Sequence, residues 1–269
     1  MEQLGVIGNI SRDVATYPGG NRVKMLGGAA LHIALAASRA GLPTAPISVI
    51  GTDLGWILGD PRLAELDLSQ VKVVPGQSCM FRLVYDDSGR LTDTEASFGV
   101  STRLTSHALS VIGSHRICHV CCRRPLDAPA VLHQLAATET LFSVDFHLAS
   151  ASAIMPVAHT ALRYARAVFV NVAEFAMLAR VADPAVLNTV VISDGPRPAT
   201  VLARGQQVAE AVPPVTTVAE VTGAGDTLTG TFLAASARGL KCQAALNEAV
   251  TAASEAVSSP RLVLPALRG

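Results

Sequence analysis

Residues 215–239 read VTTVAEVTGAGDTLTGTFLAASARG, which we interpret as a strand, a glycine turn and a helix. Backbone N–H groups at the start of a helix have no partner within it, and the helix dipole places partial positive charge there. Gly223 and Gly225 would let an anion approach these groups closely. The turn at residues 222–227 therefore predicts a phosphate-binding site.

Asp226 directly follows these glycines. Phosphate binding alone explains a carboxylate there poorly, because the carboxylate repels an anion. A base that accepts the proton of an attacking hydroxyl explains it well. An acid that only stabilises the helix dipole is the alternative. No GxxxxGK[ST] motif occurs in the chain, and the glycine spacing does not fit a dinucleotide-binding turn, so both of those phosphate loops are excluded.

Outward from this turn, short apolar runs alternate with helix-like segments, and a polar residue or glycine lies at or near the end of each run. The runs are residues 4–10, 46–51, 116–122, 141–146, 167–171 and 189–195. This rhythm is typical of a doubly wound, mostly parallel sheet, whose ligands bind at the carboxyl ends of the strands. Ala, Val and Leu carry the apolar content, which suits helices packed on a buried sheet.

Residues 79–100 interrupt this rhythm with alternating apolar and polar residues around the Asp-Asp-Ser-Gly sequence at 86–89. This is a hairpin signature, and a polar hairpin within an α/β chain predicts an excursion from the main sheet, such as a lid. We expect a single domain over residues 1–269, with lid segments at about 10–26 and 76–102.

The composition excludes nucleic acid and anionic membrane as main partners. Lys plus Arg and Asp plus Glu both number 21, so the net charge is zero and there is no basic excess. The first ten residues lack the basic and apolar regions of a signal peptide, and the apolar stretches fall short of a membrane span. We therefore expect a cytoplasmic protein.

The five cysteines are an odd number without secretory features, which indicates reduced thiols. Cys118 and Cys121 form a CxxC motif with His115 and His119 nearby, and these are the residue types of a zinc site. No second CxxC or HxxxH pair follows, and neighbouring side chains on a strand point to opposite faces. We interpret this segment as a strand with buried thiols.

The order of motifs resembles the PfkB, or ribokinase-like, family of carbohydrate and nucleoside kinases. TGAGD is similar to the C-terminal signature of that family. Further similar motifs are GNISRD at 8–13, GGAALHIALAASRAGLP at 27–43, VIGTDLG at 49–55, NVAE at 171–174 and SDGP at 193–196. Each motif is short, but together they cover nearly the whole chain in the family's order. The resemblance implies a three-layer α/β/α sandwich with a mostly parallel central sheet and a small β lid.

The resemblance also implies the chemistry: phosphorylation of a hydroxyl on a sugar or sugar-like molecule, with ATP and Mg²⁺. Asp226 would be the general base, and Gly223, Ala224 and Gly225 would form an anion hole. A nucleoside is an alternative acceptor, since His32 and the low-polarity strand before residue 123 favour a flat base. A ligand-sensing member without catalysis is a third hypothesis.

Four residues are expected at the acceptor: Asp13, Gly27, Gly28 and His32. Asp13 follows a strand, where a short acid can accept two hydrogen bonds from a diol, but a turn-forming Asp is the alternative. The two glycines permit close backbone approach to a ligand, and a tight turn explains them equally. His32 stands where the family usually has Asn, and a packed helix histidine is its alternative.

Asn171 and Glu174 follow an apolar run and offer hard oxygen ligands, which suits Mg²⁺ bound indirectly, with Glu174 acting through water. A helix N-cap with a carboxylate three residues on explains them too, and both interpretations can hold together. Asp145 ends another run on the same predicted edge, where a supporting role and an ordinary loop Asp stay open.

The resemblance further places Ser193, Gly195, Thr222 and Asn247 at the nucleotide. The family often has Asp and Thr where Glu220 and Val221 stand, so potassium activation is uncertain in this chain. The lid of the family often pairs two subunits, which implies a possible homodimer.

Overall fold

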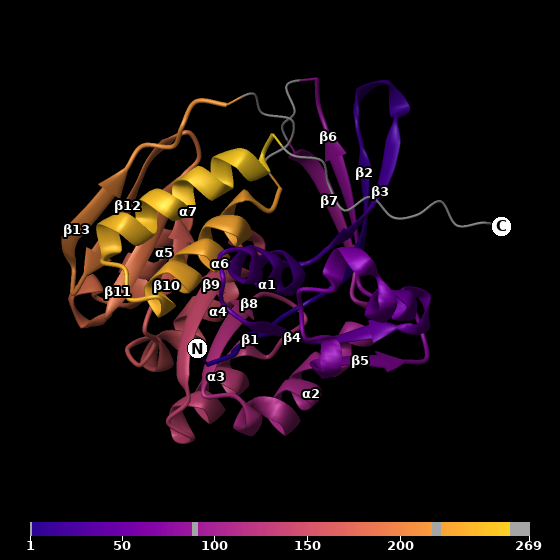
Figure 1. The fold of residues 1–269 in the computed structure, drawn as a ribbon, viewed down its shortest axis with the longest axis horizontal. Helices are drawn as coiled ribbons and strands as arrows, with labels where there is room; N and C mark the ends of the chain where they lie inside the picture. The colour runs from indigo at the N-terminus through magenta and orange to yellow at the C-terminus, as the bar shows by residue number, and fades with distance from the viewer. Residues whose placement is uncertain (1, 88–90, 217–221, 259–269) are drawn as a thin grey trace.

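The structure is a computed structural model that describes residues 2–87, 91–216 and 222–258. Within these residues, nine strands form one sheet in the order β13-β12-β11-β10-β9-β8-β1-β4-β5 (Figure 1). The strands are β1 (Leu4–Ile7), β4 (Thr44–Gly51), β5 (Val71–Val74), β8 (Ile117–Cys122), β9 (Leu141–Phe146), β10 (Val168–Asn171), β11 (Thr189–Asp194), β12 (Arg197–Ala203) and β13 (Gln206–Ala211). Neighbouring strands from β5 to β11 pair in parallel, and β12 alone among these strands is reversed, because the β11–β12 and β12–β13 pairs are antiparallel.

Helices cover both faces of this sheet. One layer holds α1 (Ala29–Arg39), α6 (Ala224–Ala237) and α7 (Cys242–Ala256), and the other holds α2 (Leu104–Val111), α3 (Ala128–Ala137), α4 (Leu148–Leu162) and α5 (Val172–Val181). Successive side chains of a strand point to opposite faces of the sheet, so each strand contacts both helix layers. In β10, Val168 and Val170 pack toward α4 and α5, whereas Phe169 packs on Phe232 of α6. The predicted three-layer sandwich is confirmed. In the part of the chain that the structure describes, no helix is long and apolar enough to span a membrane.

A glycine lets α6 pack closely against α1. A Cβ at Gly230 would lie 2.3 Å from the carbonyl oxygen of Ile33, so the two backbones could not approach with any larger residue. Ala36 and Ala37 lie beside the same point. The small residues that follow TGAGD are therefore explained by helix packing, and this contact fixes the start of α6 relative to α1.

A second, smaller sheet stands beside the sandwich, in the order β3-β2-β6-β7 (Figure 1). Its strands are β2 (Ser11–Thr16), β3 (Arg22–Gly27), β6 (Met80–Tyr85) and β7 (Leu91–Ser97). Both segments expected to form a lid contribute two strands each. The parallel pairing of β2 with β6 joins these segments, which lie far apart in the sequence. The polar stretch from residue 11 to 20 thus includes the strand β2, in which Ser11, Asp13 and Ala15 are buried and Ala15 packs in this sheet's own apolar cluster.

The hairpin of β12 and β13 departs from the expected alternation of strands and helices. Its two turn residues, Arg204 and Gly205, both have positive φ, at 50° and 76°. Such a turn usually carries Asn or Asp before the glycine, and Arg at positive φ is uncommon, so the sequence gives a weak signal. The strand expected before the TGAGD turn falls largely on residues 217–221, which lie outside the described residues.

Candidate active site

Polar residues gather where the parallel strands end. Arg123 comes directly after β8, Asp145 lies near the end of β9, and Asn171 ends β10. Asn171 is the register partner of Ser193 on β11, and Asp145 is the partner of Cys121 on β8. Because the carboxyl ends of parallel strands meet at one edge, the sheet brings these side chains to the same side of the molecule.

The glycine turn places the start of α6 at this edge. Gly223 is the N-cap, in the left-handed conformation with φ 83°, and it provides no side chain to bond the free amides. The first hydrogen bond of the helix runs from Thr227 N to Gly223 O, at 2.9 Å. The amides of Ala224, Gly225 and Asp226 come before it in the chain and therefore have no acceptor within the helix. The four residues predicted for the anion hole and base therefore lie together at a helix start whose geometry fits a phosphate.

A chain of polar contacts runs from Asp226 into the sheet. Arg123 Nη2 donates to Asp226 Oδ1 at 3.3 Å and also contacts Asp145 Oδ2. The other oxygen of Asp145 lies 3.2 Å from His119 Nε2, and His119 Nδ1 lies 2.8 Å from Ser143 Oγ. Sequence reasoning left Asp145 undecided and missed Arg123, although Arg123 follows an apolar strand as Asn171 does.

The charges in this chain of contacts support one another. Burial opposes ionisation of Asp145, but Arg123 and a hydrogen bond from His119 hold its pKa below the ordinary value. Burial likewise opposes the charge on Arg123, and the two carboxylates more than offset this, so its pKa is raised. Arg123 is thus a permanent cation between two carboxylates.

The predicted strand of thiols is β8. Among the described residues, His119, Cys121 and Asp145 place ligand-type atoms within 4.8 Å of one another. Burial raises the pKa of the Cys121 thiol well above its ordinary value, which disfavours the thiolate that zinc requires. His119 and Asp145 bond each other instead. The hydrogen bond between His119 and Asp145 therefore explains why these side chains lie together. All five cysteines of the chain are free thiols.

Asn171 and Glu174 form a capping box at the start of α5. Asn171 Oδ1 accepts from Glu174 N, and Glu174 Oε2 accepts from Asn171 N, each at 2.9 Å. Glu174 is buried, and this raises its pKa from 4.5 to about 7. A buried carboxylate that is costly to ionise, beside a sheet edge lined with further carboxylates, fits a nearby divalent cation, because the cation offsets the burial.

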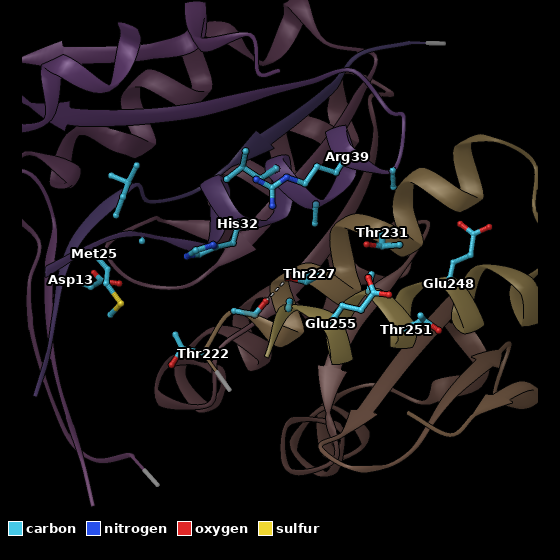
Figure 2. Close-up of a pocket in the computed structure, with 18 of the residues that line it drawn as sticks. Asp13, Met25, His32, Arg39, Thr222, Thr227, Thr231, Glu248, Thr251 and Glu255 are labelled. Carbon is cyan, nitrogen blue, oxygen red and sulfur yellow. Dashed lines mark hydrogen bonds between the residues drawn. The ribbon is translucent and has the colours of Figure 1, made fainter. Parts of the chain in front are cut away.

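A cavity of about 720 Å³ opens between the small sheet and the helices α1, α6 and α7 (Figure 2). Its lining combines carboxylates, hydroxyls and apolar side chains. Of the described residues predicted for function, it includes Asp13, Gly27, His32, Thr222, Gly223 and Asn247. Ser193 lies instead near the end of β11, and Gly195 lies in the turn to β12, so the structure does not bring them to this cavity.

The two glycines of the GGAALH motif are explained by contacts within the chain. A Cβ at Gly27 would lie 2.0 Å from Asp13 Oδ2, and one at Gly28 would lie 2.2 Å from Asn9 O. Gly28 also has φ 100°, which favours glycine. These glycines allow β2 and β3 to place Asp13 against the cavity. His32 faces the phosphate turn, since a Cβ at Gly223 would lie 3.7 Å from His32 Cγ.

Tyr85 joins the small sheet to the phosphate turn, and the sequence did not point to it. Its hydroxyl oxygen lies 2.7 Å from Thr222 Oγ1. Its ring stacks on Tyr17 with the centroids 5.3 Å apart. The only available signal was its place at the end of an alternating strand.

Glu220 and Val221, which made potassium activation uncertain, lie outside the described residues.

Comparison with known proteins gives a family match over nearly the whole chain. The model of the pfkB family carbohydrate kinases matches residues 1–266. A cytidine kinase from Thermococcus kodakarensis is 34% identical over 104 residues, which are 39% of this chain and 37% of that protein. The match thus spans well under half the length of that relative.

Solved structures show the same fold at low identity. A nucleoside kinase from Burkholderia thailandensis, in complex with inosine, matches with a TM-score of 0.83 and 17% identity, over 96% of this chain and 91% of that chain. A putative ribokinase II from E. coli also matches with a TM-score of 0.83 and 17% identity, over 97% and 94%. The chain therefore belongs to the pfkB family of carbohydrate kinases, as its TGAGD motif and the motifs around it predict.

Proposed function

We propose that this protein is an ATP-dependent kinase that phosphorylates a hydroxyl group of a nucleoside, with Asp226 as the general base. One observation carries this proposal: Asp226 stands at a glycine-rich helix start, at the strand ends and next to the turn that lines the acceptor cavity. A carboxylate in that place serves proton abstraction better than it serves phosphate binding.

The lining of the cavity favours a nucleoside over a bare sugar. Asp13 offers a carboxylate for the ribose diol at one end (Figure 2). Met25, Leu26 and Leu35 supply apolar surface and His32 a flat ring, which suit a base. Similarity to a cytidine kinase supports the same acceptor class. A free sugar remains the second candidate, because Asp13 would bind its hydroxyls equally well.

The proposed step is a direct transfer. Asp226 accepts the proton of the acceptor hydroxyl while the acceptor oxygen forms a bond to the γ-phosphorus of ATP. The bond between that phosphorus and the oxygen that bridges to the β-phosphate breaks, and ADP leaves. The amides of Gly223, Ala224 and Gly225 donate to the phosphoryl oxygens, where negative charge must be stabilised.

Residues at the strand ends would hold the nucleotide and its metal. Asn171 and Glu174 would hold Mg²⁺ through water, consistent with the raised pKa of Glu174, and the ion would neutralise charge on the triphosphate. Thr222 and Asn247 from the cavity, with Ser193 and Gly195 at the next strand end, would contact ATP. Potassium dependence stays open.

The small sheet would act as a lid over the acceptor. It already contacts the phosphate turn through Tyr85 and Thr222, so closure would need only a small movement. Closing would exclude water and suppress ATP hydrolysis. Pairing of two lids in a homodimer stays a prediction that size measurement in solution tests.

The experiment is ADP release with Mg-ATP across cytidine, uridine, adenosine, inosine, pseudouridine, ribose and fructose. We expect turnover with at least one nucleoside and a loss of about 10²–10⁴-fold in Asp226→Asn, the scale of removing a general base. Asp127→Asn is the matched control, because Asp127 caps the start of α3 and is exposed. Equal turnover in wild type and Asp226→Asn would contradict the role of Asp226.

A further inference from the structure

Arg123 lies at the site, and the proposed function does not use it. Backbone bonds fix the turn that carries it: Arg123 N donates to Cys121 O at 2.8 Å, and Leu126 N donates to Arg123 O at 3.2 Å. Its guanidinium reaches Asp226, the proposed base. An acceptor oxygen within hydrogen-bond distance of Asp226 would place the attacked phosphorus only about 3–3.5 Å further on. The transferring phosphoryl group would therefore come within reach of Arg123.

An ion pair with a purely structural role does not explain the unused donors of the Arg123 guanidinium. Both contacts, to Asp145 and to Asp226, use Nη2. Nε is buried and has no acceptor among the residues that the structure describes, although an unpaired buried N–H is costly. The side chain is 19% exposed, so it is not enclosed on every side. A guanidinium carries five donors in a planar fork that matches phosphate oxygens.

The two carboxylates hold Arg123 unequally. Asp145 is itself fixed, because His119 bonds its other oxygen and Ser143 bonds His119. His119 is fully buried, so this side of the contact is rigid. Asp226 is more exposed than Asp145, and its contact with Nη2 is long at 3.3 Å. Arg123 is therefore anchored at Asp145 and exchangeable at Asp226.

We propose that Arg123 is a catalytic residue that exchanges Asp226 for the transferring phosphoryl group, while Asp145 keeps it at the sheet edge. This inference rests on the proposed function. As the acceptor oxygen bonds to the γ-phosphorus and the bond to ADP breaks, the acceptor proton passes to Asp226. The γ-phosphate of bound ATP already competes with Asp226 for the guanidinium across the long 3.3 Å contact. The exchange is complete when Asp226 takes the proton and becomes neutral, while the phosphoryl oxygens require a cation.

The first test compares the binding of ADP with that of an ATP analogue whose β–γ bridge cannot be hydrolysed, each with Mg²⁺, by calorimetry. Wild type should prefer the ATP analogue. Arg123→Met should reduce this preference about 10-fold or more and leave ADP affinity unchanged, because only the γ-phosphate contact is lost. A residue with a purely structural role would not separate the two nucleotides.

Arg116→Met is the matched control. Arg116 stands at the opposite end of β8, pairs with Glu2 and is 84% exposed, so this substitution removes the same charge from the same strand away from the site. Arg123→Lys is the second variant, since it keeps a cation beside Asp145 and will fold if Arg123→Met does not. We expect it to lose part of the preference for the ATP analogue, and Arg123→Met to lose about 10²–10³-fold in kcat.

The outcomes separate this inference from the proposed function. If the Arg123 variants keep the wild-type preference for the ATP analogue while Asp226→Asn loses turnover, the kinase stands and the role of Arg123 is wrong. If wild type binds neither nucleotide, the proposed function fails and this inference fails with it. Loss of the preference in both Arg123 variants, with Arg116→Met unchanged, supports the phosphoryl contact.

Discussion

The hydroxyl oxygens of Tyr85 and Thr222 lie 2.7 Å apart, which ties the small sheet to the turn that begins α6. Tyr85 belongs to β6 and Thr222 directly precedes the N-cap glycine, so one hydrogen bond links the proposed lid to the proposed phosphate site. Movement of the small sheet and ordering of the phosphate turn are therefore expected to be coupled.

Tyr85→Phe tests this coupling. The substitution keeps the ring and its stacking on Tyr17 but removes the hydroxyl, so the fold should survive while closure weakens. We expect a higher ratio of ATP hydrolysis to acceptor phosphorylation, because water enters a site that closes less well. ADP release measured with and without acceptor gives that ratio. Tyr164→Phe is the control, since Tyr164 is exposed and pairs only with Arg163 among its described neighbours. An unchanged ratio in Tyr85→Phe would remove this contact from the closure mechanism.

Gly27→Ala tests the acceptor site. The added methyl would lie 2.0 Å from Asp13 Oδ2, so the carboxylate must rotate away from its place in the cavity. We expect kcat/KM for the acceptor to fall by up to about 10²-fold, the cost of a misplacement of roughly 1 Å, with the affinity for ATP unchanged. Gly113→Ala is the control, because a Cβ there meets nothing within 4 Å. Wild-type kinetics in Gly27→Ala would show that Asp13 does not position the acceptor.

Gly225→Ala separates ligand binding from folding. A Cβ at Gly225 meets nothing within 4 Å, and alanine favours a helix over glycine by up to about 1 kcal/mol, so the Tm should rise or stay unchanged. The same methyl would obstruct a phosphate seated on the first turn of α6. We therefore expect a higher KM for ATP in a protein that is no less stable. A normal KM for ATP would show that phosphate does not approach this turn closely.

Glu174→Gln should change stability in a pH-dependent way. Burial raises the pKa of Glu174 from 4.5 to about 7, so its contribution to stability is complete below pH 4.5 and is lost as the pH rises through about 7. Glutamine stays neutral and still completes the capping box. The variant should match wild type near pH 4.5 and melt higher at pH 8, by about 2–4 °C for each kcal/mol gained.

The same substitution should impair catalysis if Glu174 helps to hold Mg²⁺. We expect the magnesium concentration required for half-maximal turnover to rise, because an amide attracts a hydrated divalent cation less than a carboxylate does. Glu95→Gln controls for loss of charge, since Glu95 is 70% exposed on β7. A variant with wild-type magnesium dependence would assign Glu174 to capping alone.

The sequence predicted those parts of the molecule that local pattern controls. The TGAGD motif could be interpreted from the sequence alone, because its glycines, the helix start and the acid are neighbours in the chain. The sandwich followed from alternating strands and helices, and the capping box followed from the spacing of Asn171 and Glu174. In the TGAGD motif and the capping box, one short segment of sequence both forms the helix start and carries the polar groups of the candidate site.

The rest depended on distant pairings that no local pattern encodes. Arg123 gains its significance from Asp226, 103 residues away, and Tyr85 gains its own from Thr222, 137 residues away. The role of Asp145 was undecided because only the register of β8 and β9 places it beside His119 and Arg123. Gly27 and Gly28 were left open between close approach to a ligand and a tight turn, because no local pattern shows that Asp13 and Asn9 of the same chain occupy the space around their Cβ positions.

Single-turnover transfer of the γ-phosphate from labelled ATP to cytidine or the best acceptor of the panel, in wild type and Asp226→Asn, tests the central claim most directly. With enzyme in excess over ATP, product release does not affect the rate. We predict rapid formation of nucleoside monophosphate in wild type and a rate lower by about 10²–10⁴-fold in Asp226→Asn, with ATP and acceptor still bound. Transfer at the same rate in both proteins would contradict the assignment of Asp226 as the general base.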